Sequence, residues 1–329
     1  MRLVTFNLDT PVGPVSRIGA LVGEQVIDLG LATTLMLHDQ GETGRAYEVS
    51  AAVVPPDMIE FLRGGPLSRR YAEEAVRHAA GKGGTVAGPR GERVFHRLSE
   101  TRLLAPVPRP TSIRDTLSFE GHMKNFEKRT GRPVPPLWYE RPAYYKGNPA
   151  SVIGPEVEVQ WPPYTEKLDY ELEFGIYIGK MGRDIRVEDA RSHIAGYTIF
   201  NDISARDTIK QEVSLFLGPG KAKDMDTGNI MGPCLVTPDE IDPDDLRMYA
   251  RINGEVWSQG HSSDMYWSFE EIIAHISQSE TLHPGDFIGS GTIWDGCGDE
   301  LDRWIQPGDV VELEVEGIGI LRNRIARRT

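Results

Sequence analysis

Apolar and polar residues alternate with a period of two in several segments of the chain, which predicts β-strands. In the clearest case, Val311–Val315 alternates with glutamates before a turn at residues 317–319 leads into a second strand at Ile320–Asn323. The other predicted strands are Arg2–Leu8, Arg17–Val22, Gln25–Leu29, Glu171–Ile178, Gly196–Phe200 and Arg247–Ile252. A hairpin turn is predicted at Asn253-Gly254, directly after the last of these.

Helix signals are fewer. Asp57 is placed to cap a helix over Met58–Arg63, and Pro66 begins a longer helix that is expected to end near residue 80. Farther along, Ser268 and Glu271 have the spacing of a capping box in front of an apolar run. The first hundred residues therefore combine strands and helices, whereas β-structure dominates the rest.

The proline-dense segment Leu104–Pro110 predicts an extended linker, because proline interrupts helices and central strands. We place a domain boundary there, with a small N-terminal α/β domain at residues 1–103 and a larger domain at residues 104–329. The predicted fold class is α+β, dominated by β-structure. The segment Gly218–Lys221 lacks the spacing of a phosphate-binding loop, which argues against a nucleotide-binding fold.

Charge and composition narrow the function. The 329 residues carry 36 lysines and arginines against 49 acidic residues, a net charge of −13 that disfavours nucleic acids and anionic membranes as partners. An anionic substrate then needs a locally positive site, such as a bound cation. Cys234 and Cys297 have no Cys or His neighbour at zinc-ligand spacing, so no thiolate metal site is predicted. Without a visible signal peptide or long apolar run, the protein is expected to be cytoplasmic.

Acidic residues alternate with apolar ones in the segment Leu168–Phe174. On a strand, side chains two positions apart share a face, so Asp169, Glu171 and Glu173 are expected to lie together. Carboxylates this close repel one another unless a cation neutralises them, and a site made of oxygen donors favours Mg²⁺, Mn²⁺ or Ca²⁺ over zinc. The alternative is an acidic strand face in contact with solvent.

Other polar residues are suited to chemistry at the same site. Asp202 follows a predicted strand and is a candidate third carboxylate ligand, with Arg206 and Asp207 as a supporting ion pair; a capped turn with a surface salt bridge is the alternative. His122 becomes a general-base candidate only if a carboxylate orients it near a metal. Lys223 is placed to hold a substrate carboxylate or an oxyanion, although most lysines are solvated surface charges.

Taken in order, these segments resemble the catalytic domain of the fumarylacetoacetate hydrolase family. The matching segments are Leu104–Pro110, Asp115 with His122, Tyr145–Ser151, Asp169–Glu173, Asn201–Asp207, Lys223–Asp224, Thr281–Asp286, Gly289–Thr292 and Glu300–Asp309. Each segment is weakly specific alone, but the ordered set is highly specific and covers about residues 103–325. The N-terminal part resembles the small leading domain of many bacterial members.

The resemblance implies a divalent-metal site, with Mg²⁺ the expected ion and Mn²⁺ or Ca²⁺ as alternatives. Glu171, Glu173 and Asp202 match the family's metal ligands. Asp115 matches the acid that completes the metal shell in the members that cleave fumarylacetoacetate.

The resemblance also implies catalytic and substrate-binding residues. His122 matches the base that activates water, and Glu300 matches its carboxylate partner. Lys223 matches a lysine near the metal that stabilises a developing oxyanion. Tyr145 and Thr292 match residues that contact substrate.

The implied fold is a β-rich mixed barrel or roll, commonly assembled as a homodimer. The implied activity is hydrolysis of a C–C bond in a small 2-oxo acid, such as an acylpyruvate, through a metal-stabilised enolate. The same scaffold also serves oxaloacetate decarboxylation, dehydration of 2-oxo-3-deoxy sugar acids and enol–keto isomerisation, so these remain alternatives. A non-catalytic metal-binding protein is a further alternative, which the intact set of acids, histidine and lysine disfavours.

Several positions depart from the family pattern. Leu117 and Ile209 stand where the fumarylacetoacetate-cleaving members have a tyrosine and a glutamine, which argues against fumarylacetoacetate as the substrate. Asn125 stands where many short bacterial members have a glutamate. The segment Gly121–Trp138 is expected to fold over substrate as a lid, and its basic residues, Arg129 and Arg132 among them, are candidates for binding a second substrate carboxylate.

Overall fold

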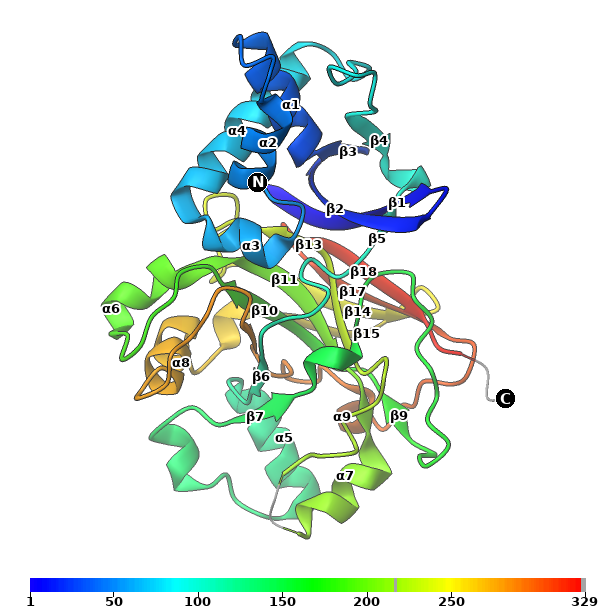
Figure 1. Ribbon diagram of the computed structural model, residues 1–329. Helices are drawn as coiled ribbons and strands as arrows, with labels where there is room; N and C mark the ends of the chain where they lie inside the picture. The colour runs from blue at the N-terminus through cyan, green and yellow to red at the C-terminus, as the bar shows by residue number, and fades with distance from the viewer. Residues whose placement is uncertain (216–217, 327–329) are drawn as a thin grey trace.

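The computed structural model describes residues 1–215 and 218–326 (Figure 1). Helices α1, α2 and α4 gather at one end of the molecule, and α5, α7 and α9 lie at the other (Figure 1). Within the described residues, no helix has both the length and the apolar character needed to cross a membrane.

The N-terminal segment is an antiparallel run of strands packed against helices. Its elements are β1 Arg2–Thr10, β2 Gly13–Val22, β3 Gln25–Asp28, α1 Leu29–Asp39, α2 Ala46–Val53, α3 Met58–Arg63, α4 Gly65–Gly81, β4 Phe95–Arg97 and β5 Arg102–Leu103. The Asp57 side chain accepts from the backbone N–H of Glu60, so the predicted cap of α3 is confirmed. The helices α1 and α2 were not predicted. Seven residues of α1 are buried, so it shows no narrow apolar stripe from which a helix could be recognised.

The remaining described residues extend this run of strands and form two further sheets, with short helices at their edges. The strands are β6 Ile113–Thr116, β7 Tyr144–Gly147, β8 Val152–Ile153, β9 Leu168–Asp169, β10 Leu172–Ile178, β11 Ile194–Asp202, β12 Ser204–Ala205, β13 Asn229–Val236, β14 Arg247–Ile252, β15 Glu255–His261, β16 Phe287–Gly289, β17 Val310–Val315 and β18 Gly319–Arg324. The helices are α5 Glu120–Thr130, α6 Val187–Ala190, α7 Arg206–Val213, α8 Phe269–Ile276 and α9 Gly298–Leu301.

One mixed sheet of 12 strands runs through the molecule in the order β4-β3-β2-β1-β13-β11-β10-β16-β6-β7, with β5 and β8 paired beside this path. A second sheet has the order β15-β14-β17-β18, and β12 and β9 form a two-stranded antiparallel sheet. The predicted α+β class, dominated by β-structure, is confirmed. Since β1 pairs with β13 through Arg2↔Val236 and Leu3↔Leu235, the sheet continues across the predicted domain boundary. The division at residue 104 therefore stays a prediction.

The central strands β10 and β11 are enclosed by the hydrophobic core. Every residue of β10 is buried, and so is every residue of β11 except Ala195. Apolar side chains of β17 and β18 in the second sheet, such as Leu313 and Leu321, belong to the same core cluster as Phe174 and Ile199. Strands packed on both faces have little freedom to shift, so polar side chains at their ends are held firmly.

The capping box predicted from Ser268 and Glu271 is present at the start of α8, and its contribution to stability can be tested. Ser268 Oγ accepts from the Glu271 N–H, and the Glu271 carboxylate accepts from the Ser268 N–H. Ser268→Ala removes one half of this arrangement and is expected to lower the free energy of unfolding by about 1 kcal/mol. Chemical denaturation of the two proteins measures the difference. Ser192→Ala, which removes an exposed hydroxyl outside any cap, is the control, with an expected change below about 0.5 kcal/mol. Equal effects of the two substitutions would contradict the capping role.

Candidate active site

Three carboxylates from neighbouring strands converge at one end of the large sheet. Asp115 lies on β6, Glu173 on β10 and Asp202 at the end of β11, and one oxygen of each lies within 4.8 Å of the others. Gly289 on the intervening strand β16 makes this possible, because a Cβ atom there would lie 2.4 Å from Asp115 Oδ1. We call Asp115, Glu173 and Asp202 the acid cluster.

The acid cluster is buried and short of positive charge. Glu173 Oε2 and Asp202 Oδ1 are buried without a hydrogen-bond partner among the described residues. Burial and repulsion from Asp202 raise the pKa of Asp115 to about 7, and burial raises the pKa of Asp202 to about 6 despite the nearby Lys223. Burial and the neighbouring acids also raise the pKa of Glu173 well above its usual value. Buried oxygen donors that lack partners fit a hard divalent cation.

Glu171 is buried beside the acid cluster but does not belong to it. Lys223 Nζ lies 2.5 Å from Glu171 Oε2 and 2.6 Å from Asp202 Oδ2, and Arg206 Nη2 lies 2.8 Å from Glu171 Oε1. Although burial opposes ionisation, these two cations lower the pKa of Glu171 to about 2. With both of its oxygens engaged, the assignment of Glu171 as a metal ligand stays a prediction.

The two predicted substrate contacts also lie at the acid cluster. Tyr145 Oη donates to Asp202 Oδ2 at 2.5 Å, and Thr292 Oγ1 donates to Glu173 Oε1 at 3.1 Å. Burial and the carboxylates around it raise the pKa of Tyr145 well above its usual value, so the phenol keeps its proton. Both side chains therefore act as neutral donors beside the carboxylates, and their contact with substrate stays a prediction.

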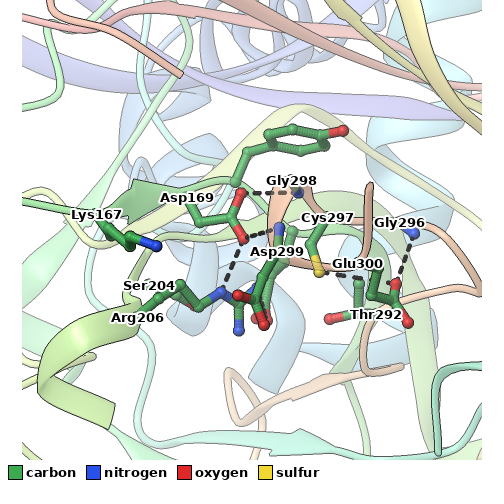
Figure 2. A network of polar contacts seen from close by, with 12 residues as sticks. Lys167, Asp169, Ser204, Arg206, Thr292, Gly296, Cys297, Gly298, Asp299 and Glu300 are labelled. Atoms are coloured by element: carbon green, nitrogen blue, oxygen red, sulfur yellow. Dashed lines mark hydrogen bonds and ion pairs between the residues drawn. The ribbon is translucent and has the colours of Figure 1, made fainter. Parts of the chain in front are cut away.

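Arg206 joins the strands to helix α9. Its Nε donates to Asp169 Oδ2 at 2.8 Å, while Asp169 also accepts from the backbone N–H groups of Gly298 and Asp299 at the start of α9 (Figure 2). The predicted pair of Arg206 with Asp207 is wrong, because adjacent residues at the start of α7 point in different directions. Asp207 instead accepts from Thr165 and Glu166. Asp169, Glu171 and Glu173 are buried to 5% exposure or less, so a solvated acidic strand face is also excluded.

His122 and Glu300 form a second polar group, held between α5 and α9. His122 Nδ1 lies 3.0 Å from Glu300 Oε1. Burial opposes protonation of the imidazole, but Glu300 outweighs it and raises the pKa of His122 above its usual value. The Glu300 carboxylate also accepts from Asn125 Nδ2, which lies 3.0 Å from Oε1. Its Oε2 accepts from the Gly296 N–H at 3.0 Å (Figure 2). We call His122 and Glu300 the dyad.

The predicted lid begins with α5, the helix that carries His122. Arg129 Nη1 lies 2.5 Å from Asp299 Oδ2 and so connects α5 to α9. Arg132 is exposed, and no ion pair of its side chain is found within residues 1–215 and 218–326. Binding of a second substrate carboxylate by Arg129 and Arg132 stays a prediction.

Several contacts of this site were not predicted from the sequence. Asn125 lies one helical turn after His122, so a helix prediction over this segment would have placed both on one face. Cys297 Sγ lies 3.7 Å from Glu300 Oε2 and near His122, which no spacing along the chain reveals. The contacts of Asp169 with α9 join segments 129 and 130 residues apart and have no local signal.

Comparisons with known proteins identify the family of the chain. Residues 111–326 match the family model described as fumarylacetoacetate hydrolase C-terminal. The human protein named oxaloacetate tautomerase FAHD2A, mitochondrial, is 32% identical over 332 residues, which cover 99% of this chain and 91% of that protein. Oxaloacetate tautomerase YisK of Bacillus subtilis is 33% identical over 312 residues, 93% of this chain and 98% of YisK.

A solved structure extends the likeness to the whole fold. The fumarylacetoacetate hydrolase of Exiguobacterium antarcticum superposes with a TM-score of 0.71 and 26% identity, covering 99% of this chain and 100% of that one. The family match covers most of the chain, and the two relatives extend over nearly all of it. The chain therefore belongs to the fumarylacetoacetate hydrolase family of enzymes.

Proposed function

We propose that the protein is a divalent-metal-dependent enzyme that interconverts the keto and enol forms of oxaloacetate or a closely related 2-oxo dicarboxylate. The observation that carries this proposal is the placement of a histidine–carboxylate dyad beside a buried acid cluster that fits a cation. The names of the relatives at 32% and 33% identity support oxaloacetate as the substrate. The family members that cleave fumarylacetoacetate have polar residues at the positions of Leu117 and Ile209. Their absence here further disfavours fumarylacetoacetate as the substrate.

The acid cluster is the proposed cation site. Asp115, Glu173 and Asp202 supply the oxygen donors, and Glu171 joins them if a cation replaces Lys223 as its partner. When bound, a divalent cation supplies a positive charge that polarises the 2-oxo group and the carboxylate next to it. The Lys223 ammonium, which contacts both Glu171 and Asp202, supplies further positive charge at the same place.

The dyad is proposed to move the proton. Enolisation removes a proton from C3, forms the C2–C3 double bond and places negative charge on the C2 oxygen, which then takes up a proton. His122 is the proposed acceptor of the C3 proton, and Glu300 orients the imidazole and stabilises its protonated form. Lys223 supplies positive charge near the oxygen that becomes negative. The reverse sequence returns the proton to C3, so no water is consumed.

Hydrolysis of a C–C bond in an acylpyruvate is the second candidate. The same dyad is suited to taking a proton from water instead of from C3, and the solved relative from Exiguobacterium antarcticum is named a hydrolase. The two activities differ in their products, because hydrolysis adds water and yields two acids, whereas tautomerisation leaves the mass unchanged.

A direct assay separates these functions. The ultraviolet absorbance of the oxaloacetate enol is followed after mixing the Mg²⁺- or Mn²⁺-loaded protein with substrate, and again after chelation. The expected result is a chelator-sensitive acceleration of enol–keto equilibration without a new product by mass spectrometry. Cleavage of acylpyruvates into two acids, with no effect on the equilibration of oxaloacetate, would overturn the tautomerase proposal in favour of hydrolysis.

Replacement of His122 tests the dyad. His122→Asn is expected to lower kcat by roughly 10²–10⁴-fold, the usual contribution of a positioned general base, while Mg²⁺ binding is retained. Steady-state kinetics on oxaloacetate measures the loss. His261→Asn is the matched control, because His261 lies 3.1 Å from Asp245 in a histidine–carboxylate pair outside the site. A proton-transfer role for His122 is untenable if both variants keep the same kcat.

Cation binding and pH are expected to act on the same carboxylates. The folded-state pKa values of Asp115 and Asp202, about 7 and about 6, exceed the ordinary 3.8. Their protonation therefore stabilises the metal-free fold below pH 4, and this contribution is lost as pH rises through 6 and 7. Because protons compete with cations, Mg²⁺ or Mn²⁺ is expected to raise Tm more at pH 8 than at pH 5. Thermal unfolding with chelator and with cation measures both effects.

Two variants control the cation experiment. Asp202→Asn removes a carboxylate of the acid cluster and is expected to abolish most of the cation-induced increase in Tm. Asp28→Asn changes a buried carboxylate that pairs with Arg17 outside the site, so it lowers Tm but preserves the increase. If the cation-induced increase in Tm is independent of pH, or is equal in the two variants, the cation binds outside the acid cluster.

A further inference from the structure

Cys297 brings a thiol into contact with the dyad. Its Sγ lies 3.7 Å from Glu300 Oε2, and a ring nitrogen of His122, Cys297 Sγ and a carboxylate oxygen of Glu300 all lie within 4.8 Å of one another. His122 comes from α5, whereas Cys297 is the N-cap residue of α9 and Glu300 lies within that helix. Figure 2 shows the Cys297 sulfur beside the Glu300 carboxylate. We call His122, Cys297 and Glu300 the mixed-donor group.

The spacing of the mixed-donor group matches a metal site. Ligands at about 2.0 Å for nitrogen or oxygen and about 2.3 Å for sulfur lie about 3.3–3.5 Å apart around a tetrahedral ion. Cys297 Sγ lies 3.7 Å from Glu300 Oε2, which is close to this range, and His122 Nδ1 lies 3.0 Å from the other carboxylate oxygen, Oε1. A small movement would therefore bring the nitrogen, the sulfur and one oxygen to ligand spacing. His122 Nδ1 is buried and makes no aligned hydrogen bond, so its position allows it to act as a ligand.

The chemistry of these donors differs from that of the acid cluster. Nitrogen and sulfur donors favour borderline and soft ions such as Zn²⁺ and Cd²⁺, whereas carboxylates alone favour Mg²⁺ and Mn²⁺. Arg206 is the nearby positive charge that would oppose a cation, but its guanidinium is already paired with Asp169 and Glu171. Cys297 is 1% exposed, so the site also excludes most competing water.

We propose that His122, Cys297 and Glu300 form a second metal site, selective for Zn²⁺-like ions, whose occupation inhibits the enzyme. Binding forms metal bonds to His122 Nδ1, the Cys297 sulfur and the Glu300 carboxylate. It releases the thiol proton to solvent, together with the second proton of any protonated imidazole, and leaves the one remaining ring proton on Nε2. A ligated His122 no longer accepts a proton from substrate. The binding step stands independently, whereas inhibition rests on the proposed function.

Metal–thiolate absorption tests the binding step. The Mg²⁺-saturated full chain is titrated with Cd²⁺, and the ultraviolet charge-transfer band of a Cd²⁺–thiolate bond is measured, which a site of oxygen donors cannot produce. The expected result is one equivalent of thiolate-bound Cd²⁺ in the natural protein and none in Cys297→Ser. Cys234→Ser is the matched control, because this other buried cysteine faces the Ile318 carbonyl at 3.5 Å, and the band is expected to be unchanged.

A second variant keeps the test decisive if Cys297→Ser does not fold. Glu300→Gln retains the thiol but weakens one ligand, so the Cd²⁺ affinity is expected to fall by at least about tenfold while the band persists at high Cd²⁺. The proposal is overturned if the natural protein shows no thiolate band, or if neither variant changes it.

Zn²⁺ inhibition completes the experiment. Zn²⁺ is expected to inhibit turnover in the natural protein and in Cys234→Ser, and to do so at least about tenfold more weakly in Cys297→Ser. A thiolate band without turnover of oxaloacetate would mean that the proposed substrate is wrong but the second metal site is present. Turnover that stays fully active with bound Cd²⁺ would overturn the inhibitory role.

Discussion

Compensation of buried negative charge is the constraint on which this structure depends. Among residues 1–215 and 218–326, Glu171 is neutralised by Lys223 and Arg206, whereas the one ion pair of the acid cluster is that of Asp202 with Lys223. An uncompensated buried ion costs several kcal/mol, so the remaining carboxylates must hold protons or a cation. The raised pKa values and the unpartnered oxygens of the cluster are two consequences of that shortage. The features that make the metal-free fold costly are therefore those that prepare it to bind a cation.

The Arg206 side chain connects the charges beside the acid cluster to the dyad. It contacts Glu171 on one side and Asp169 on the other, and Asp169 accepts the first N–H groups of α9, the helix that carries Glu300. The position of the dyad thus depends on the charges beside the acid cluster. Asn125 and the Gly296 N–H fix the same Glu300 carboxylate from its other sides, so the dyad is oriented before substrate arrives.

The sequence predicted features with local signals and failed where contacts are distant in the chain. The alternation of apolar residues with glutamates predicted β17, and the spacing of Ser268 and Glu271 predicted the cap of α8. Apart from Glu171, the acids assigned to the metal by family resemblance do converge, because their strands are neighbours or flank β16. The partner of Arg206 was predicted wrongly, since its choice between Asp207 and Asp169 is decided by tertiary packing. Helix α1 was missed because burial on several sides removes the amphipathic pattern.

Cys297 shows how one contact serves two purposes. Its thiol lies at hydrogen-bond distance from Glu300 Oε2, so without metal it helps to hold the carboxylate that orients His122. A serine hydroxyl at position 297 would also be able to donate a hydrogen bond to Glu300, but it would bind Zn²⁺-like ions far less well than a thiolate does. Under the two proposals, the acid cluster binds hard ions and the mixed-donor group binds soft ions, because their donor atoms differ. The balance between activation and inhibition would then follow the relative availability of the two kinds of ion.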